Sequence, residues 1–130
     1  MLEQVARLLS KLLHQYQPVK SFSWGNYKMT VKISGVDLSA NTTANIGQAG
    51  SSGGTYTVHI LNRSSSTAFV QLGVGDSSAT FANATKLLEN TQIAPDESLS
   101  FSPVVAGASD YVIGRSTVAS VNMVMMGHDE

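Results

Sequence analysis

The spacing of hydrophobic residues changes once along this chain, and that change limits the possible folds more than any other feature. Near the N-terminus, apolar residues recur every three or four positions, which is the spacing of one face of an α-helix. From Phe22 onward they recur at every second position, which is the spacing of a β-strand with one buried face. With 130 residues the chain has room for one hydrophobic core. The pattern therefore predicts a single β body preceded by a helical arm.

The arm is predicted to be an amphipathic α-helix over residues 2–16, within an N-terminal segment of residues 1–20. Its apolar stripe consists of Leu2, Val5, Leu8, Leu9, Leu12, Leu13 and Tyr16. The helix is expected to end before Pro18, which lacks an amide hydrogen and restricts the residue preceding it. A lone helix of about 15 residues is marginal in water, so the stripe needs cover from the β body or another subunit. The stripe residues and Trp24 are therefore the predicted partner-binding residues.

Short strands are predicted throughout residues 21–130. The candidate strands are residues 29–33, 56–61, 68–74, 87–93, 99–105, 111–115 and 121–126. In the first of them the alternation predicts that Met29, Val31 and Ile33 face the core. About seven short strands with no helix between them predict a mainly β fold, an antiparallel and jelly-roll-like β-sandwich.

One segment interrupts this rhythm. Residues 36–54 lack a clear period and end in Gly and Ser residues. This composition is typical of flexible connections, so the segment is predicted to be a flexible loop or binding strap.

Composition excludes several classes of function. Charged residues make up 13% of the chain, the formal net charge is −1, and the lysines and arginines occur singly. A nucleic-acid partner would ordinarily need a concentrated basic face. The absence of cysteine excludes disulfides and thiolate metal sites. No apolar run approaches the roughly 18 residues that span a bilayer, and no signal peptide is expected, so no membrane partner is predicted.

The residues that most often carry chemistry are scattered. His14, His59 and His128 share no metal-ligand spacing, so no metal or other cofactor is predicted. The pair Asp96 and Glu97 follows a proline, which is typical of a turn. Glycines crowd the loop before residue 55, but no lysine follows at the spacing of a phosphate-binding loop. The sequence therefore contains no catalytic motif, and a non-enzymatic role is expected.

Aromatic residues leave one alternative open. Trp24, Tyr27, Tyr56 and Phe69 could form a platform on which a sugar stacks, as in a glycan-binding module. The same residues could instead pack in the core or hold the arm against the sheet, and we favour this second interpretation.

The order of strands and turns in the second half of the chain is the last informative feature. A strand ending in Asn62 is followed by a strand that ends at Asp76 and by a turn containing Pro95. A strand ending near Arg115 and a last strand closing with Gly127 and acidic residues complete the order. Residues 55–130 in this order resemble a β-sandwich module that recurs in virion proteins of tailed bacteriophages.

This resemblance implies a structural component of a phage particle assembled in the host cytoplasm. The expected roles are a capsid decoration (cement) protein, which we favour, or a tail, neck, baseplate or fibre component. The expected partner is the major capsid protein or another virion protein. Because three arms meeting on a symmetry axis would shelter their stripes, a homotrimer is the expected oligomer.

Overall fold

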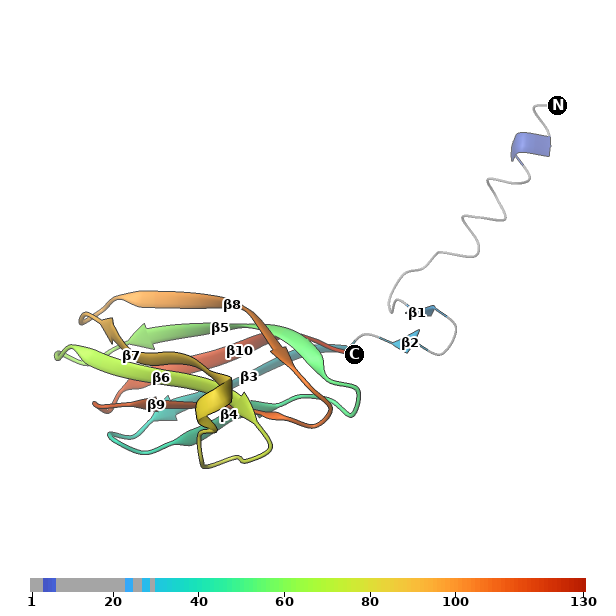
Figure 1. The fold of residues 1–130 in the computed structure, drawn as a ribbon. Coiled ribbons are helices and arrows are strands. Elements are labelled where there is room, and N and C mark those ends of the chain that lie inside the picture. Colours follow the sequence, from blue (N-terminus) through green and yellow to red (C-terminus); the bar gives the residue numbers. More distant parts are fainter. Residues whose placement is uncertain (1–3, 7–22, 25–26, 29) are drawn as a thin grey trace.

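The computed structural model describes residues 4–6, 23–24, 27–28 and 30–130 of the chain. Within these residues the protein is mainly β, and Figure 1 shows its two antiparallel four-stranded sheets. One sheet has the strand order β3-β10-β5-β8, and the other has the order β4-β9-β6-β7. The strands of the first sheet are β3 (Thr30–Leu38), β5 (Gly54–Asn62), β8 (Ser98–Ala106) and β10 (Val121–Asp129). Those of the second are β4 (Ala44–Gln48), β6 (Ala68–Gly75), β7 (Lys86–Ile93) and β9 (Tyr111–Ser116).

Three short elements accompany the two sheets within the described part of residues 23–130. Before the sandwich, β1 (Ser23–Trp24) pairs antiparallel with β2 (Tyr27–Lys28). Between β6 and β7 the chain forms the single 3₁₀ turn η1 (Asn83–Thr85). Apart from the β6–β7 connection, every link between consecutive strands from β3 to β10 passes from one sheet to the other.

The two sheets pack face to face around one hydrophobic cluster. Its fully buried members come from both sheets and include Val58, Ile60, Met123, Val70 and Leu72. Every second residue of β5 is buried, because alternate side chains of a strand point to opposite faces. The prediction of an antiparallel β-sandwich is confirmed at this level, although the two sheets contain eight strands where the sequence suggested about seven.

The hydrogen bonds of one buried asparagine connect the turn after β5 with the end of β7. Asn62, which has no exposed surface, ends β5. Its side-chain amide donates to the carbonyl oxygens of Ser66 at 2.8 Å and Ile93 at 3.0 Å, and its side-chain oxygen accepts from the Ser64 amide at 3.0 Å. Because each polar atom of this side chain has a partner, its burial costs little. The turn after β5 is thereby joined to the end of β7.

Residues 36–54 are not one flexible loop, so this prediction is wrong. Residues 36–38 end β3, and Ala44–Gln48 form β4 against β9. A β-bulge between Asn45 and Gly47 leaves the neighbouring residues Ile46 and Gly47 both buried, which breaks the alternation of a regular strand. This irregularity hides the strand from a search for period two.

The close approach of the sheets gives the first testable prediction. A methyl group added at Gly114, on β9, would collide with the sulfur of Met123 on the opposite sheet and lie 3.1 Å from Ile46 Cδ1. We expect Gly114→Ala to lower the free energy of unfolding by about 1–3 kcal/mol, the usual effect of overpacking a core. Urea denaturation measures this change.

Gly75→Ala is the matched control. A methyl group at Gly75 would have its nearest neighbour at 3.8 Å, which is ordinary van der Waals contact. We expect this variant to change stability by less than about 0.5 kcal/mol. Equal losses in the two variants would contradict the packing described here.

Candidate functional site

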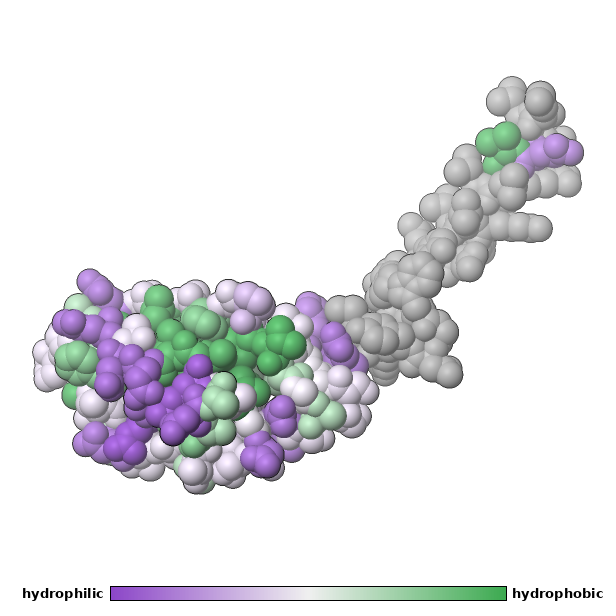
Figure 2. Space-filling model, in the orientation of Figure 1, coloured by the Kyte–Doolittle hydropathy of each residue, from purple (hydrophilic) through white to green (hydrophobic). Residues whose placement is uncertain are grey.

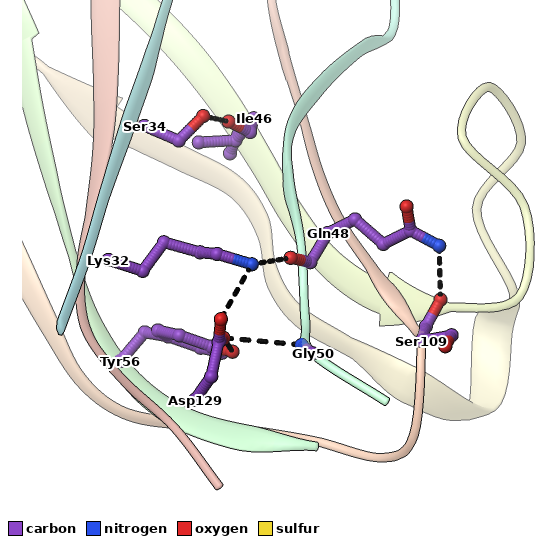
Figure 3. Close-up of polar contacts among 8 residues, drawn as sticks. All are labelled: Lys32, Ser34, Ile46, Gln48, Gly50, Tyr56, Ser109 and Asp129. Atoms are coloured by element: carbon purple, nitrogen blue, oxygen red, sulfur yellow. Dashed lines mark hydrogen bonds and ion pairs between the residues drawn. The ribbon is translucent and has the colours of Figure 1, made fainter. Parts of the chain in front are cut away.

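A polar network lies at the end of the sandwich where β10 finishes, and Figure 3 shows it in close-up. The Asp129 carboxylate accepts hydrogen bonds from the Tyr56 hydroxyl and from the Gly50 amide at 3.2 Å. It also forms an ion pair with the Lys32 ammonium at 3.0 Å. We call these four residues the Asp129 latch. The latch joins β3, the β4–β5 loop, β5 and β10.

Polar side chains of β3 also reach across to the opposite sheet. The Lys32 ammonium donates to the main-chain carbonyl of Gln48, and the Ser34 hydroxyl donates to that of Ile46 at 2.6 Å. Both acceptors lie on β4, which is the edge strand of its sheet, and β3 is the edge strand of the other sheet. These hydrogen bonds therefore close one side of the sandwich and require Lys32 and Ser34 to point inward.

The electrostatics of the latch favour an ionised Asp129. Burial raises the pKa of the Tyr56 hydroxyl, and the neighbouring Asp129 carboxylate raises it further, so Tyr56 stays protonated and donates. Burial by itself would raise the pKa of the Asp129 carboxyl. The hydrogen bonds from Tyr56 and Lys32, together with the charge of Lys32, outweigh this effect and hold the pKa below its ordinary value.

The inward direction of Lys32 and Ser34 places the apolar residues of β3 in solvent. Val31 is 69% exposed and Ile33 is 74% exposed. The prediction that Val31 and Ile33 face the core is wrong, and Met29 lies outside the described residues. The physical reason is that side chains of a strand alternate, so an inward Lys32 forces both of its neighbours outward.

Strand β10 continues this apolar surface. Every second residue from Val121 to Met125 is fully buried in the core. Val124 and Met126 alternate with these buried residues and lie on the outer face of the sheet, where Met126 pairs with Ile33. A strand with hydrophobic residues on both faces is ordinarily covered on both. On the outer face of β10, Val124 and Met126 thus form an apolar stretch between the polar residues Asn122 and His128.

We call Val31, Ile33, Val124 and Met126 the apolar patch. It lies on the outer face of the β3-β10 half of its sheet. Beside it is a shallow groove of about 240 Å³ at Gly35, whose missing side chain leaves Val124 uncovered on that side. Hydrophobic patches of this kind, bordered by polar residues, mark interaction surfaces.

A charged border limits the patch at one end. Arg63 pairs with Asp37 at 2.8 Å and donates to the side-chain oxygen of Asn122 at 2.8 Å. Asp37 and Asn122 are pairing partners on β3 and β10. On the outer face they follow the pair of Ile33 with Met126 and the pair of Gly35 with Val124. The patch is thus an apolar area with a hydrophilic margin, which resembles the centre and rim of a protein interface.

Hydrophobic surface is also visible on the opposite side of the sandwich. Figure 2 shows it gathered where β7 and β8 lie, next to hydrophilic side chains. Leu88, Leu99 and Phe101 are partly buried there and pack against the core. Val105 of β8 is 68% exposed, and it lies on the outer face of the sheet that carries the apolar patch, at the opposite edge from Val31. This side is the margin of the core, where the two sheets are not joined by a latch, and it supplies a control for the apolar patch.

Among the predicted partner-binding residues, the structure describes only Val5 and the backbone of Trp24. Leu2, Leu8, Leu9, Leu12, Leu13 and Tyr16 lie outside the described residues. Residues 4–6 are helical, and Val5 among them is exposed. The backbone of Trp24 lies in β1, and its side chain lies outside the description. The helical arm and its role in binding therefore stay predictions.

The aromatic platform suggested by the sequence does not form from its described members. Tyr56 is only 1% exposed and belongs to the core and the latch. Phe69 lies on β6 in the other sheet and is 41% exposed. These two rings therefore cannot contact one sugar together.

Two further features of the described residues bear on function. No group of three acidic or histidine side chains that could hold a metal occurs within residues 30–130, where His59 instead contacts the Ser100 hydroxyl at 2.9 Å. No helix in the described part of the chain has the length and apolar character needed to span a membrane.

No protein-family model matches this chain, and neither a curated protein nor a solved structure matches it. Its function is therefore inferred from the geometry of its own residues.

The latch residues and the patch were missed by sequence reasoning, although one signal of the patch was readable. The run from Val121 to Met126 is apolar at nearly every position, which differs from the alternation of a strand with one solvated face. Lys32 gave no such signal, because a lysine between hydrophobic residues is typical of an outward-facing position.

The latch predicts how stability depends on pH. Because the pKa of Asp129 is lower in the folded chain, ionised Asp129 contributes stability that is fully present above its unfolded pKa of about 4 and is lost as the pH falls through the folded value. We expect the stability difference between the wild type and Asp129→Asn to shrink as the pH falls from about 5 to about 3. Urea denaturation at several pH values measures this difference.

Asp37→Asn serves as the control, because the ion pair of Asp37 with Arg63 is largely exposed and contributes little. A stability difference for Asp129→Asn that stayed constant over the same pH range would contradict the latch.

Proposed function

We propose that this protein is a structural component of a bacteriophage particle, specifically a capsid decoration protein that binds the outside of the shell through the apolar patch. The observation that carries this proposal is that two neighbouring strands, β3 and β10, turn hydrophobic side chains away from a complete core. The expected partner is the major capsid protein. The proposal assigns no catalytic role and no cofactor.

The connectivity of the strands supports the proposal at the level of architecture. Two facing four-stranded sheets, in the orders β3-β10-β5-β8 and β4-β9-β6-β7, correspond to an eight-stranded jelly roll. Jelly rolls occur in viral capsid proteins, lectins and cupins. Because one fold serves several functions, the patch carries the argument and the topology only agrees with it.

Burial of the patch residues contributes favourable free energy to binding. Full burial of a valine or isoleucine side chain contributes about 1.5–3 kcal/mol, so Val31 and Ile33 are the strongest anchors of the patch. Latch contacts hold both residues in place before binding, so little conformational freedom of the strand is lost.

The predicted arm adds a second point of attachment. It precedes β3 in the chain, and its apolar stripe needs cover just as the patch does. Two linked contacts on one shell bind far more tightly than either alone, provided that both can be made at once. We propose that three copies meet around a symmetry axis of the shell, where their arms contact one another and the capsid protein.

A tail, neck, baseplate or fibre position is the alternative within the same particle. It would use the same patch, but the protein would sediment with tail assemblies and not with shells. Host-glycan binding through Trp24 and Tyr27 has no support from the described residues.

A matched pair of substitutions tests the patch. Val31 and Val105 are almost equally exposed, at 69% and 68%, but only Val31 belongs to the patch. We expect Val31→Lys to weaken binding to undecorated capsids of the same phage at least tenfold, because an unpaired charge would be buried in the interface. Val105→Lys, at the other edge of the same sheet face, should weaken binding much less. Co-sedimentation with increasing protein concentration measures both affinities.

Failure of the wild type to sediment with capsids would overturn the decoration role. Equal effects of the two lysine substitutions would overturn the assignment of the patch. Circular dichroism of both variants checks that each remains folded.

Deletion of residues 1–20 tests the arm. We expect the shortened chain to keep its β-sheet spectrum, because the sandwich has its own core in residues 30–130. We expect it to lose the trimer in analytical ultracentrifugation and to lose capsid binding. Unfolding of the shortened chain would instead make the arm part of the core, and unchanged capsid binding would remove the arm from the interface.

A further inference from the structure

The outer face of the second sheet carries a cup that the proposed function does not use. It has a volume of about 330 Å³, which is at the lower end of the range for small-molecule sites. The cup is lined by Asn41, Phe69, Gln71, Asn90, Arg115 and Thr117. Five of these six side chains are polar, and the sixth is an aromatic ring.

Arg115 supplies the positive charge of the cup, and the nearby Glu89 carboxylate, which accepts from Gln71 at 2.8 Å, is paired with Lys86 at 2.9 Å. Arg115 lies on β9 directly opposite Gln71 of β6, so the two side chains are neighbours on the outer face. Among the ion pairs of residues 30–130, none involves Arg115. Its guanidinium therefore keeps the planar set of donors that binds a carboxylate in two parallel hydrogen bonds.

Phe69 supplies an apolar wall. It is 41% exposed on the outer face of β6, where a hydrophobic ring of this size is ordinarily covered. Two hydrogen bonds to Thr117 hold the backbone of Phe69 in place. The Phe69 amide donates to the Thr117 hydroxyl at 3.1 Å, and the Thr117 amide donates to the Phe69 carbonyl at 3.1 Å. The ring is thus presented from a rigid strand.

Two asparagines complete the rim from opposite sides. Asn41 lies in the β3–β4 connection, and its amide donates to the Ser116 carbonyl at 2.8 Å. Asn90 lies in β7, where the pairing with β6 is irregular. Both have left-handed backbone conformations, with φ of 54° and 51°. Such conformations are uncommon outside glycine and concentrate at functional sites, although asparagine tolerates them better than most residues.

The chain covers the neighbouring part of the same face, which confines the cup. Phe81, in the connection between β6 and β7, lies over Gly73, so that a methyl group there would come within 2.9 Å of its ring. Gly73 pairs with Ile113, whose neighbour Gly114 faces the core, so Ile113 lies on the outer face. Ile113 is nevertheless only 1% exposed, because this part of the outer face is covered. The cup is therefore a bounded depression at one end of the sheet.

We propose that this cup binds one sugar residue bearing a carboxylate, such as a uronic or sialic acid within a glycan. Arg115 pairs with the carboxylate, the side-chain amides of Asn41 and Asn90 exchange hydrogen bonds with hydroxyl groups, and the C–H face of the sugar stacks on Phe69. The side-chain oxygen of Gln71 accepts a further hydroxyl hydrogen bond, since its amide nitrogen already donates to Glu89. A single cation suits a singly charged carboxylate better than a phosphate chain, which would need a cluster of basic residues. This inference does not depend on the proposed capsid role, because it uses the other sheet.

The test compares acidic and neutral sugars of matched length. Isothermal titration calorimetry is carried out on the full chain with trigalacturonate against galactotriose and with sialyllactose against lactose. We expect at least one acidic sugar to bind, with its neutral counterpart at least tenfold weaker, because the Arg115 contact is charge-assisted.

Substitutions then locate the binding. We expect Arg115→Gln to weaken binding of the acidic sugar at least tenfold and Phe69→Ala to weaken it severalfold. Arg63→Gln is the matched control, because Arg63 lies in the β5–β6 connection and is paired with Asp37 of the other sheet. Absence of binding by both acidic sugars, equal binding of the neutral ones, or unchanged binding by Arg115→Gln would each overturn the proposal.

Discussion

The contact between Lys32 and Asp129 is the constraint from which the rest of this structure follows. An ammonium group directed inward between two sheets needs a partner, and the carboxylate at the end of β10 provides one at 3.0 Å. The carboxylate in turn needs donors, which the Tyr56 hydroxyl and the Gly50 amide provide. This pairing sets which face of β3 is inside, and a shift of one residue would reverse it.

The register of β3 explains why a stable sandwich exposes large hydrophobic side chains. The latch directs Lys32 inward, so the side chains of Val31 and Ile33 must point outward. Polar residues at these two positions would make the surface more soluble, but the chain has hydrophobic ones. The apolar residues continue onto β10 as Val124 and Met126, so the outer face carries a hydrophobic patch with polar residues at its ends. In the proposed decoration role this face is covered by the shell. The cup around Arg115 lies on the opposite sheet and would then face away from the particle, where glycans of a host surface are met.

The sequence was most informative where side chains alternate without interruption. In the strand predicted at residues 56–61, Tyr56, Val58 and Ile60 occupy alternate positions, and the structure buries all three on one face of β5. Strand β4 was missed because its bulge places Ile46 and Gly47 inside together. The face of β3 was reversed because the partners of Lys32 lie far away in sequence, in β4 and β10. The cup could not be foreseen either, since its lining comes from four separate parts of the chain.

The central claim is that the outer face of β3 and β10 is covered in the assembled particle, and oxidation of methionine measures this directly. Met126 is 39% exposed, whereas Met123 and Met125 on the same strand are fully buried and serve as internal references. Mild peroxide treatment followed by mass spectrometry compares the free protein with the particle-bound protein. The account predicts that Met126 is oxidised when free and protected when bound, while Met123 and Met125 stay unmodified in both. Equal oxidation of Met126 in the two states would contradict it.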